Sequence, residues 1–332
     1  MRHKILELLR QKRPSYISGE EMANLLAVSR TSVWKNIQSL QLAGYEIEGS
    51  TRLGYRLLNI PDFLYPAEIA GNFHAKRVGS NPELIHHYHQ VESTNTTLKN
   101  LADKDAPEGT IVVAEEQTVG RGRQGRSWSS PFGTGIWLSI LLRPPLSPQE
   151  TPVFTLLAAT AAVRSLKRIL PDLQVGIKWP NDLLINNRKV CGILTELKAE
   201  AEILHYLVLG IGINVNLREK DFPPNLRKIA TSLYLENGGN NVSRQKLTSV
   251  LLHELDNSYA DFLSCGPRSI LAEWKKENIT LGKNVVIKNM RGTFEGKAVD
   301  LNEDGSLIVE GEKGIRKHFH AGEVTIVPTN GG

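Results

Sequence analysis

Along residues 1–60, apolar side chains recur first at helical and then at strand spacing. Three groups have the three- and four-residue intervals of amphipathic helices, and Ser18 and Ser29 stand where the second and third helices need N-terminal caps. Two alternating runs, 45–48 and 55–58, follow around a glycine-containing turn. We therefore predict a winged helix-turn-helix domain over 1–60. Its inward positions are expected to be Ile5, Leu8, Leu9, Met22, Leu25, Leu26, Val33, Ile37 and Leu40.

The outer face of the predicted third helix is polar and basic. Residues 1–60 hold nine Lys and Arg against five Asp and Glu, which is most of the chain's formal net charge of +5. A basic face on a helix-turn-helix favours operator DNA as the partner, although a solvated protein-interaction face is the alternative. The candidate DNA-binding residues are Ser29, Arg30, Thr31, Lys35, Gln38 and Arg52.

Beyond residue 60 the pattern changes twice. Prolines mark residues 61–80 as a linker with one short helix, which would turn Ile69 and Phe73 inward. Strand-like runs then mix with helical ones over 81–278, which predicts an α/β domain with a mixed sheet. The expected strands are 84–91, 111–114, 135–142, 178–185 with a break at Pro180, 189–196 and 204–215, and the expected long helices are 151–170 and 243–264. Five short strands over 279–332 predict a small SH3-like β-barrel, so the fold class is α+β multidomain.

The segment Gly120 to Trp128 combines three glycines, three arginines and a tryptophan. Glycine lets a backbone approach a ligand closely, arginine binds phosphate or carboxylate in a bidentate manner, and tryptophan offers a flat face. Its spacing also matches the dinucleotide-binding pattern, but neither a helix nor an acidic residue follows where that fold requires them. We predict a ligand-binding loop; a solvated basic loop is the alternative.

Three further features bear on a site. Ser93, Thr94 and Asn95 precede a predicted helix, where they would serve either as N-terminal caps or as ligand contacts. Glycines within predicted strands, namely Gly192, Gly210 and Gly212, indicate a sheet surface lined by a ligand, or a bulge or tight packing contact. His86, His87 and His89 lack further ligands at metal spacing, so we expect a plain strand with surface histidines and no intrinsic metal site.

Composition excludes several classes of protein. Two cysteines far apart argue against a disulfide framework or a zinc cluster, and no apolar run is long enough to span a bilayer. The basic, amphipathic start is unlike a signal peptide. We therefore expect a cytoplasmic protein without a membrane partner.

Four motifs together resemble the biotin–protein ligase family. They are GRGRQGRSW at 120–128, KWPND at 178–182, KVCGIL at 189–194 and GIGINVN at 210–216, in that family's order and at its usual intervals. With the winged helix, the chain resembles the bifunctional bacterial type, both biotin ligase and biotin-operon repressor. The resemblance covers nearly the whole chain, and Gln124 departs from the arginine that many relatives carry there.

The resemblance implies a class II synthetase-like ligase that uses ATP, with Mg²⁺, to activate biotin as biotinyl-5′-adenylate. The biotinyl group then passes to a lysine of a biotin carboxyl carrier protein, and no prosthetic group is involved. The implied biotin contacts are Ser93, Thr94, Asn95, Gln117, Arg121, Gly122, Arg123, Lys189, Gly192, Gly210 and Gly212. The implied ATP contacts are Arg123, Arg126, Trp128, Lys178, Asn181, Asp182 and Asn214. The implied catalytic residues are Lys189, Arg123, Lys178 and Asp182.

The resemblance also implies a ligand-promoted homodimer on a two-fold operator. Two other functions stay open at this point. One is a DNA-binding sensor without ligase activity, which intact Lys189, Arg123 and Asp182 disfavour. The other is a lipoate or octanoate ligase on the same fold, against which the KWPND run stands.

Overall fold

The computed structural model describes residues 1–70, 77–79, 81–289 and 292–327, and the chain divides into two compact units. These units are Met1–Phe63 and Leu64–Gly332. The predicted inward residue Phe73 lies outside the described residues, whereas Ile69 is buried in a short helix, α4 (Pro66–Ile69). None of the helices in the described ranges has the length and apolar character needed to cross a bilayer.

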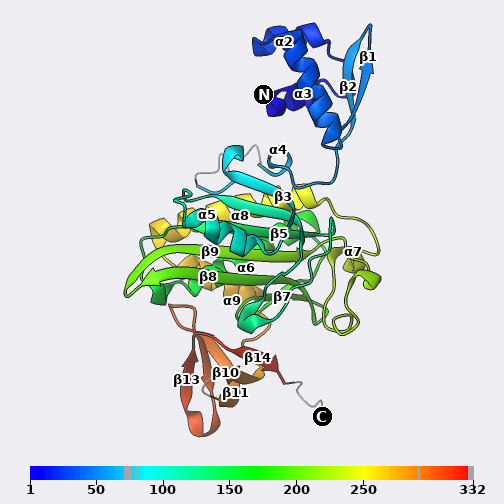
Figure 1. Ribbon diagram of the computed structural model, residues 1–332. Helices are drawn as coiled ribbons and strands as arrows, with labels where there is room; N and C mark the ends of the chain where they lie inside the picture. The colour runs from blue at the N-terminus through cyan, green and yellow to red at the C-terminus, as the bar shows by residue number, and fades with distance from the viewer. Residues whose placement is uncertain (71–76, 80, 290–291, 328–332) are drawn as a thin grey trace. The chain divides into compact units, whose positions relative to one another are not determined.

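The first unit is a three-helix bundle with a two-stranded antiparallel wing (Figure 1). Its elements are α1 (Arg2–Lys12), α2 (Gly19–Leu26), α3 (Arg30–Leu42), β1 (Glu46–Ser50) and β2 (Gly54–Asn59). Both predicted caps form: Ser18 Oγ accepts from the amide of Glu21 at 2.9 Å, and Ser29 Oγ from that of Ser32 at 3.1 Å. Each cap satisfies an amide that the first turn of a helix leaves without an intrahelical partner.

One of the predicted inward positions is wrong, because Leu25 is 60% exposed. Leu8 and Leu26 are partly buried, and Leu6, which was not predicted, is fully buried in α1. The eight-residue helix α2 buries Met22 and Ala23 instead, so Leu25 falls outside the narrow face that packs on the bundle.

A seven-stranded mixed sheet organises the second unit, with strand order β3-β4-β5-β9-β8-β7-β6. Only β3 and β4 are parallel; every other neighbouring pair is antiparallel. The strands are β3 (Ile85–Val91), β4 (Ile111–Gln117), β5 (Gly135–Leu142), β6 (Gly176–Lys178), β7 (Asp182–Ile185), β8 (Arg188–Glu200) and β9 (Ile203–Asn214).

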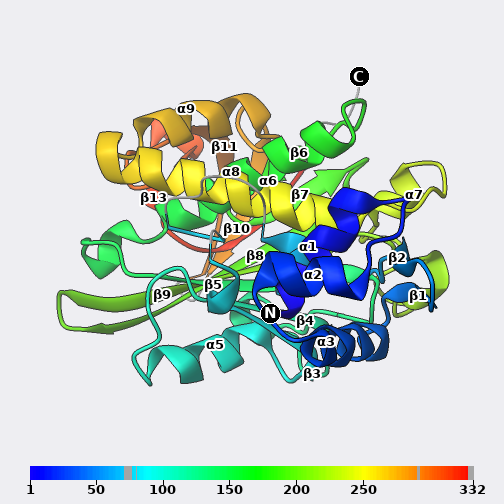
Figure 2. The ribbon, with the colours of Figure 1, turned by 90° about the horizontal axis from the view of Figure 1, so that it is seen from above.

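Helices cover the two faces of this sheet unequally. The long helices α6 (Val153–Ile169), α8 (Arg244–Cys265) and α9 (Arg268–Glu277) lie on one side, and α5 (Thr94–Ala102) lies on the other (Figures 1 and 2). Alternation along the strands explains both layers, because Ile136, Leu138 and Ile140 join the core with α6 and α8 while Leu141 packs with α5. Part of the α5 face remains without a helical cover. Short elements complete the unit: α7 (Leu233–Glu236) and 3₁₀ turns at Pro82–Leu84, Arg123–Gly125, Pro148–Glu150, Glu219–Asp221 and Glu312–Gly314.

A five-stranded antiparallel sheet ends the described chain, in the order β13-β12-β11-β10-β14. Its strands are β10 (Asn284–Asn289), β11 (Gly292–Leu301), β12 (Leu307–Glu310), β13 (Arg316–Phe319) and β14 (Glu323–Ile326). Trp179, between β6 and β7, donates its indole N–H to the carbonyl of Gly305, between β11 and β12, at 3.1 Å. This hydrogen bond connects the small sheet to the large one. The predicted fold class is confirmed: a helix-turn-helix part, a central α/β part with a mixed sheet, and a small β part.

Candidate active site and DNA-binding face

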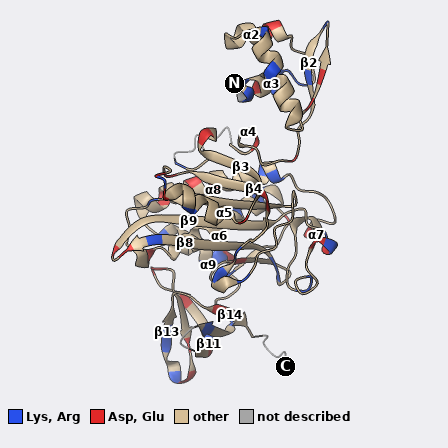
Figure 3. Ribbon diagram, in the orientation of Figure 1, with Lys and Arg blue, Asp and Glu red and all other residues tan. Residues whose placement is uncertain are grey.

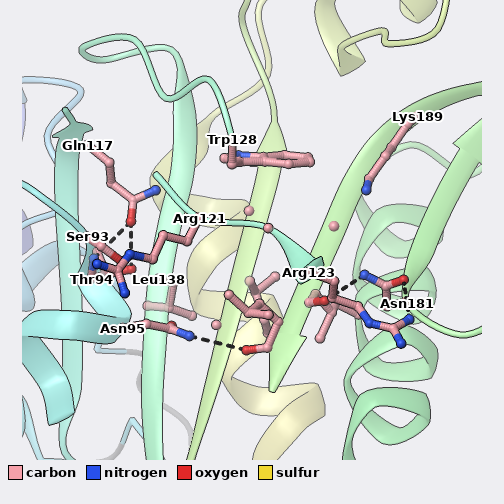
Figure 4. A pocket seen from close by; sticks show the side chains of 17 residues that line it. Ser93, Thr94, Asn95, Gln117, Arg121, Arg123, Trp128, Leu138, Asn181 and Lys189 are labelled. Carbon is pink, nitrogen blue, oxygen red and sulfur yellow. Dashed lines mark hydrogen bonds between the residues drawn. The ribbon is translucent and has the colours of Figure 1, made fainter. Parts of the chain in front are cut away.

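A pocket opens on the uncovered part of the α5 face, where the start of α5 and the loop after β4 meet strands β8 and β9 (Figure 4). About 460 Å³ within its bounds is not filled by protein atoms, and part of that space is open to the surrounding solvent. All eleven predicted biotin contacts line it. The lining is Ser93, Thr94, Asn95, Gln117, Arg121, Gly122, Arg123, Trp128, Leu138, Asn181, Lys189, Gly192, Ile193, Leu194, Gly210, Ile211 and Gly212.

Trp128 forms one wall of the pocket by lying on two glycines of neighbouring strands. Gly192 on β8 and Gly212 on β9 are paired in register. A Cβ atom on Gly212 would stand 2.6 Å from the indole nitrogen of Trp128, and one on Gly192 would stand 2.8 Å from Cζ3. Any larger side chain at either position would displace the ring. From the sequence, these strand glycines indicate either a surface lined by a ligand or a tight packing contact. Both hold for Gly192 and Gly212, which line the pocket and also pack closely against Trp128.

A second wall is polar and comes from the start of α5 and from Gln117 (Figure 4). Gln117 Oε1 accepts from the amide of Thr94 at 2.9 Å and lies 3.1 Å from the Thr94 hydroxyl, while its amide nitrogen donates to Ser130 Oγ at 2.8 Å. Ser93 is at the N-cap position but makes no side-chain capping bond, so its hydroxyl is not used for capping. This wall therefore presents hydroxyl and amide groups that suit a small polar ring.

Positive charge gathers at the other end of the pocket. Lys189 Nζ lies 2.6 Å from Asp182 Oδ1 and 5.1 Å from the centre of the Trp128 ring. Arg123 donates to Asn181 Oδ1 at 3.2 Å (Figure 4). Burial lowers the pKa of the nearby Lys178, and the Asp182 carboxylate partly offsets that effect. Such an end can neutralise a carboxylate and a phosphate brought together.

The loop from Gly120 to Trp128 folds back on itself. The Gly122 amide donates to the Arg126 carbonyl at 2.7 Å, and the Trp128 amide donates to the Gly120 carbonyl at 2.8 Å. Gln124, at the tip, has φ +56°, and the side chains of Arg121 and Arg126 are exposed. Outside the loop, Arg123 contacts Asn181 and Arg126 contacts Glu323. A short, exposed loop with so few outside contacts can move as a unit when a ligand arrives.

Four predicted residues are not part of the pocket lining. Asp182 is joined to the pocket by its ion pair with Lys189, and Lys178 is near enough to both for their charges to affect its pKa. Arg126 is instead ion-paired with Glu323 on β14. Asn214 is buried and donates its amide to the Thr231 carbonyl at 3.0 Å, so it braces the loop after β9.

The expectation of surface histidines is wrong for His87. Its side chain is 8% exposed and lies 2.9 Å from the buried carboxylate of Glu115, which also accepts from Arg244 and from the amide of Leu64. Sequence gave no sign of this partner because Glu115 belongs to the neighbouring strand. Within the described ranges, His, Cys, Asp and Glu nowhere gather in a group of three or more that could hold a metal ion.

Sequence reasoning also missed residues that support the polar wall. Ser139, Glu196 and Ser130 carry no motif and are recognisable only from their hydrogen bonds to predicted contacts. Lys99 is one step further away, since it donates to Glu196. On the first unit it missed Trp34, which is 51% exposed on α3 one helical turn from Arg30 and Gln38. The six predicted DNA-binding residues are all exposed, and Ser29 also caps α3. Figure 3 marks the Lys and Arg positions of this unit in blue on its helices and its wing.

The two cysteines should react with thiol reagents at very different rates. Complete burial beside the pocket raises the pKa of the Cys191 thiol to about 12, whereas Cys265 is exposed. Since the thiolate is the reactive form, we expect only Cys265 to be modified rapidly in the native protein at neutral pH. A timed reaction followed by mass spectrometry checks this. In the Cys265→Ser variant the only cysteine left is Cys191, so the rate measured there belongs to Cys191. Fast modification of Cys191 in the native protein would contradict the prediction.

Comparisons with known proteins agree with this geometry. The model of the biotin/lipoate A/B protein ligase family matches residues 88–214, a helix-turn-helix domain model matches 2–56, and the model of the biotin protein ligase C-terminal domain matches 280–327. The bifunctional ligase/repressor BirA of Bacillus subtilis is 41% identical over 322 residues, which cover 97% of each chain. That of Escherichia coli is 29% identical over 311 residues, 93% of this chain and 92% of that protein. Among solved structures, a biotin protein ligase from Aquifex aeolicus in complex with biotin and ATP superposes with a TM-score of 0.63 at 29% identity, covering 74% of this chain and 99% of that chain.

Proposed function

This chain belongs to the biotin protein ligase family as a bifunctional ligase and repressor, and we propose that the pocket on the α5 face is where it activates biotin. It is an ATP-dependent biotin–protein ligase with a DNA-binding helix-turn-helix part. One observation supports the assignment of the pocket above all others: a polar wall, a flat aromatic wall and a cationic end meet within one hollow. Each suits a different part of an acyl adenylate.

The reaction has two steps, and both need the cationic end. A carboxylate oxygen of biotin attacks the α-phosphorus of ATP, the bond to the β-phosphate oxygen breaks, and pyrophosphate leaves. Because two anions must approach, Lys189 and Arg123 would lower the barrier by neutralising them. A carrier lysine, as the free amine, then attacks the acyl carbon, AMP leaves, and the amine loses a proton as the amide forms.

The remaining site residues follow from this placement. Ser93, Thr94, Asn95 and Gln117 would bind the ureido ring of biotin, and Gly210, Arg121 and Gly122 would complete its surroundings. The nucleotide would contact the residues Arg123, Arg126, Trp128, Lys178, Asn181, Asp182 and Asn214.

Magnesium would arrive with the nucleotide. Asp182, the carboxylate nearest Lys189, is already ion-paired with it at 2.6 Å, so the phosphates rather than a cluster of carboxylates would supply most ligands. When bound, the ion would supply positive charge that shields the phosphates. The chain's own residues orient the two substrates and exclude water.

Mass spectrometry of a carrier protein tests the ligase assignment. Incubation of the chain with ATP, biotin and a biotin carboxyl carrier domain should add one biotinyl group to one lysine of the carrier. Parallel incubations with lipoic or octanoic acid should leave the carrier unmodified. Transfer of either acid in place of biotin would reassign the chain to the lipoate-handling branch of the family.

We further propose the division of labour along the chain. Residues 1–60 bind operator DNA, 61–80 link them to a ligase domain over 81–278, and 279–332 form the C-terminal domain; the protein acts in the cytoplasm. Occupation of the pocket would promote a homodimer, which would place two α3 helices on a two-fold operator. Sedimentation with and without biotin and ATP tests this. An equal monomer fraction under the two conditions would contradict the proposed link between ligand binding and dimerisation.

DNA binding should depend on salt through Lys35 on α3 and Arg52 in the wing. Each contact with a phosphate releases a counterion, so Lys35→Ala or Arg52→Ala should weaken binding to all duplexes and reduce the salt slope by about 1. Fluorescence anisotropy with a random-sequence duplex over a range of salt measures that slope. Lys12→Ala on α1 removes the same charge elsewhere and is expected to leave the slope nearly unchanged; equal slopes for all variants would contradict the assigned face.

A further inference from the structure

Asn95 lies in the polar wall, where its amide is held from three sides. Ser139 on β5, Gly210 on β9 and Leu194 on β8 are neighbours in register, so they form one row across the sheet. Asn95 sits on this row: a Cβ atom on Gly210 would stand only 2.2 Å from Asn95 Oδ1. The missing side chain of Gly210 therefore creates the space that the amide occupies.

Hydrogen bonds around Asn95 determine which way its amide points. The nitrogen donates to Glu196 Oε2 at 2.7 Å and to the Leu194 carbonyl at 3.3 Å; Figure 4 shows the bond to Leu194. A carbonyl can only accept a hydrogen bond, and so can the Glu196 carboxylate when it is ionised. Ser139 is completely buried, and its hydroxyl lies 2.6 Å from Asn95 Oδ1 and 2.7 Å from Thr94 Oγ1. Its one hydrogen can be donated to Asn95 when the Thr94 hydroxyl turns its own hydrogen toward Ser139. Both N–H groups of the amide are thus used within the protein.

Glu196 is kept in the form that this arrangement needs. Lys99 on α5 donates to its other carboxylate oxygen at 2.6 Å, and the pair is about three-quarters buried, with exposed fractions of 27% and 26%. Burial opposes the charge, but hydrogen bonds from Lys99 and Asn95 hold the pKa of Glu196 below its ordinary value. The carboxylate therefore remains an acceptor at neutral pH.

We propose that Glu196 and Ser139 are positioning residues that fix Asn95 so that it offers the ligand a hydrogen-bond acceptor, and so select a ring N–H donor. The proposal rests on the proposed function, because the donor would be a ureido N–H of biotin. With both amide hydrogens engaged, the free lone pair of Oδ1 is all that Asn95 can present to the pocket. An acid whose ring lacks that N–H would leave this acceptor unpaired, which is costly in a buried site.

Two kinds of measurement test this on the full-length protein. The first is the KM for biotin, the KM for ATP and kcat in carrier biotinylation for Glu196→Ala, Glu196→Gln and Ser139→Ala. We expect Glu196→Ala to raise the KM for biotin by roughly 5- to 100-fold, the cost of an unsatisfied buried group, with little change in kcat or in the KM for ATP. Glu196→Gln keeps an oxygen acceptor for Asn95 and should recover most of the loss.

Glu200→Gln is the matched control, since Glu200 is on the same strand with a side chain 87% exposed. It should behave as the wild type. Equal KM values for biotin in Glu196→Ala and Glu200→Gln would overturn the proposal. If Glu196→Ala fails to fold, by circular dichroism and thermal melting, Ser139→Ala and Glu196→Gln decide in its place.

The second measurement uses two biotin analogues, each a cyclic carbamate in which one ring N–H is replaced by oxygen. The wild type should prefer biotin to at least one of them by about 10- to 100-fold in kcat/KM. In Glu196→Ala and Ser139→Ala this preference should shrink, because the freed amide can rotate and donate. An unchanged preference would show that the two residues act only through the fold.

The outcomes separate this inference from the proposed function. A wild type that transfers no biotin to the carrier refutes the ligase assignment itself. A wild type that transfers biotin yet treats both carbamates like biotin refutes only the role of the Asn95 acceptor.

Discussion

Replacing Lys189 by methionine is expected to slow adenylate formation by about 10²- to 10³-fold, the usual effect of removing one preorganised charge from an acyl or phosphoryl transfer site. Lys189 is the cation that faces the pocket beside Trp128, and its charge is already oriented by Asp182 at 2.6 Å. Methionine keeps the length of the side chain but cannot neutralise the approaching carboxylate. Pyrophosphate release measured with saturating biotin and ATP reports this step directly.

The control for this experiment lies further along the same strand. Lys198 is 55% exposed and pairs with Asp103 away from the pocket, so Lys198→Met removes the same charge without touching the site. Its rate should match that of the wild type. A normal rate for Lys189→Met would remove this lysine from the reaction and would leave Arg123 as the cation to test.

Replacing Arg244 by leucine is expected to lower the free energy of unfolding by about 3–5 kcal/mol, since it leaves a buried carboxylate without its counter-charge. Arg244 and Glu115 are 1% and 0% exposed, with Arg244 Nη1 2.8 Å from Glu115 Oε2. The same carboxylate holds His87 and the amide of Leu64, so it joins α8, β3, β4 and the start of the second unit. Urea denaturation followed by circular dichroism measures the loss.

Two further variants show whether charge is the cause. Lys246→Ala, on the exposed side of the same helix, should change stability by less than about 0.5 kcal/mol. The double variant Glu115→Gln/Arg244→Leu should regain part of the loss, because no charge then remains unpaired. A double variant less stable than Arg244→Leu alone would contradict this explanation.

Acid should weaken the same network in the wild type. Although burial opposes it, the hydrogen bond from His87 and the charge of Arg244 hold the pKa of Glu115 below its ordinary 4.5. A lowered pKa means that the unfolded chain binds the proton more readily, so this contribution is complete above 4.5 and is lost as the pH falls through the lowered value. The double variant should lack that part of the acid destabilisation.

Local sequence predicted the elements and motifs well, because caps, turns and periodicity act over a few residues. Ser18 and Ser29 cap the helices that they were expected to cap, and the loop from Gly120 to Trp128 lies at the pocket. From the sequence, a hairpin turn is expected at Asn187 and Arg188, but it lies one residue earlier: positive φ falls on Asn186 and Asn187, and Arg188 already begins β8. Asparagine tolerates that conformation better than arginine, which the pair of asparagines could have revealed.

Contacts that join distant segments could not be predicted in this way. Gly210 was expected to make room for a ligand, yet its missing side chain first makes room for Asn95, 115 residues earlier in the chain. His87 was placed at the surface because only the strand order brings it to Glu115. Such pairs depend on register between strands, which a single sequence does not specify.

Hydrogen–deuterium exchange, resolved to short peptides, tests most directly whether the pocket and its arginine loop enclose the activated acid. With biotin and ATP present, amides from Gly120 to Trp128 and at the start of α5 should exchange much more slowly than in the free protein, while α9 should not change. Slower exchange elsewhere, with the 120–128 loop exchanging at the same rate in both states, would contradict the account.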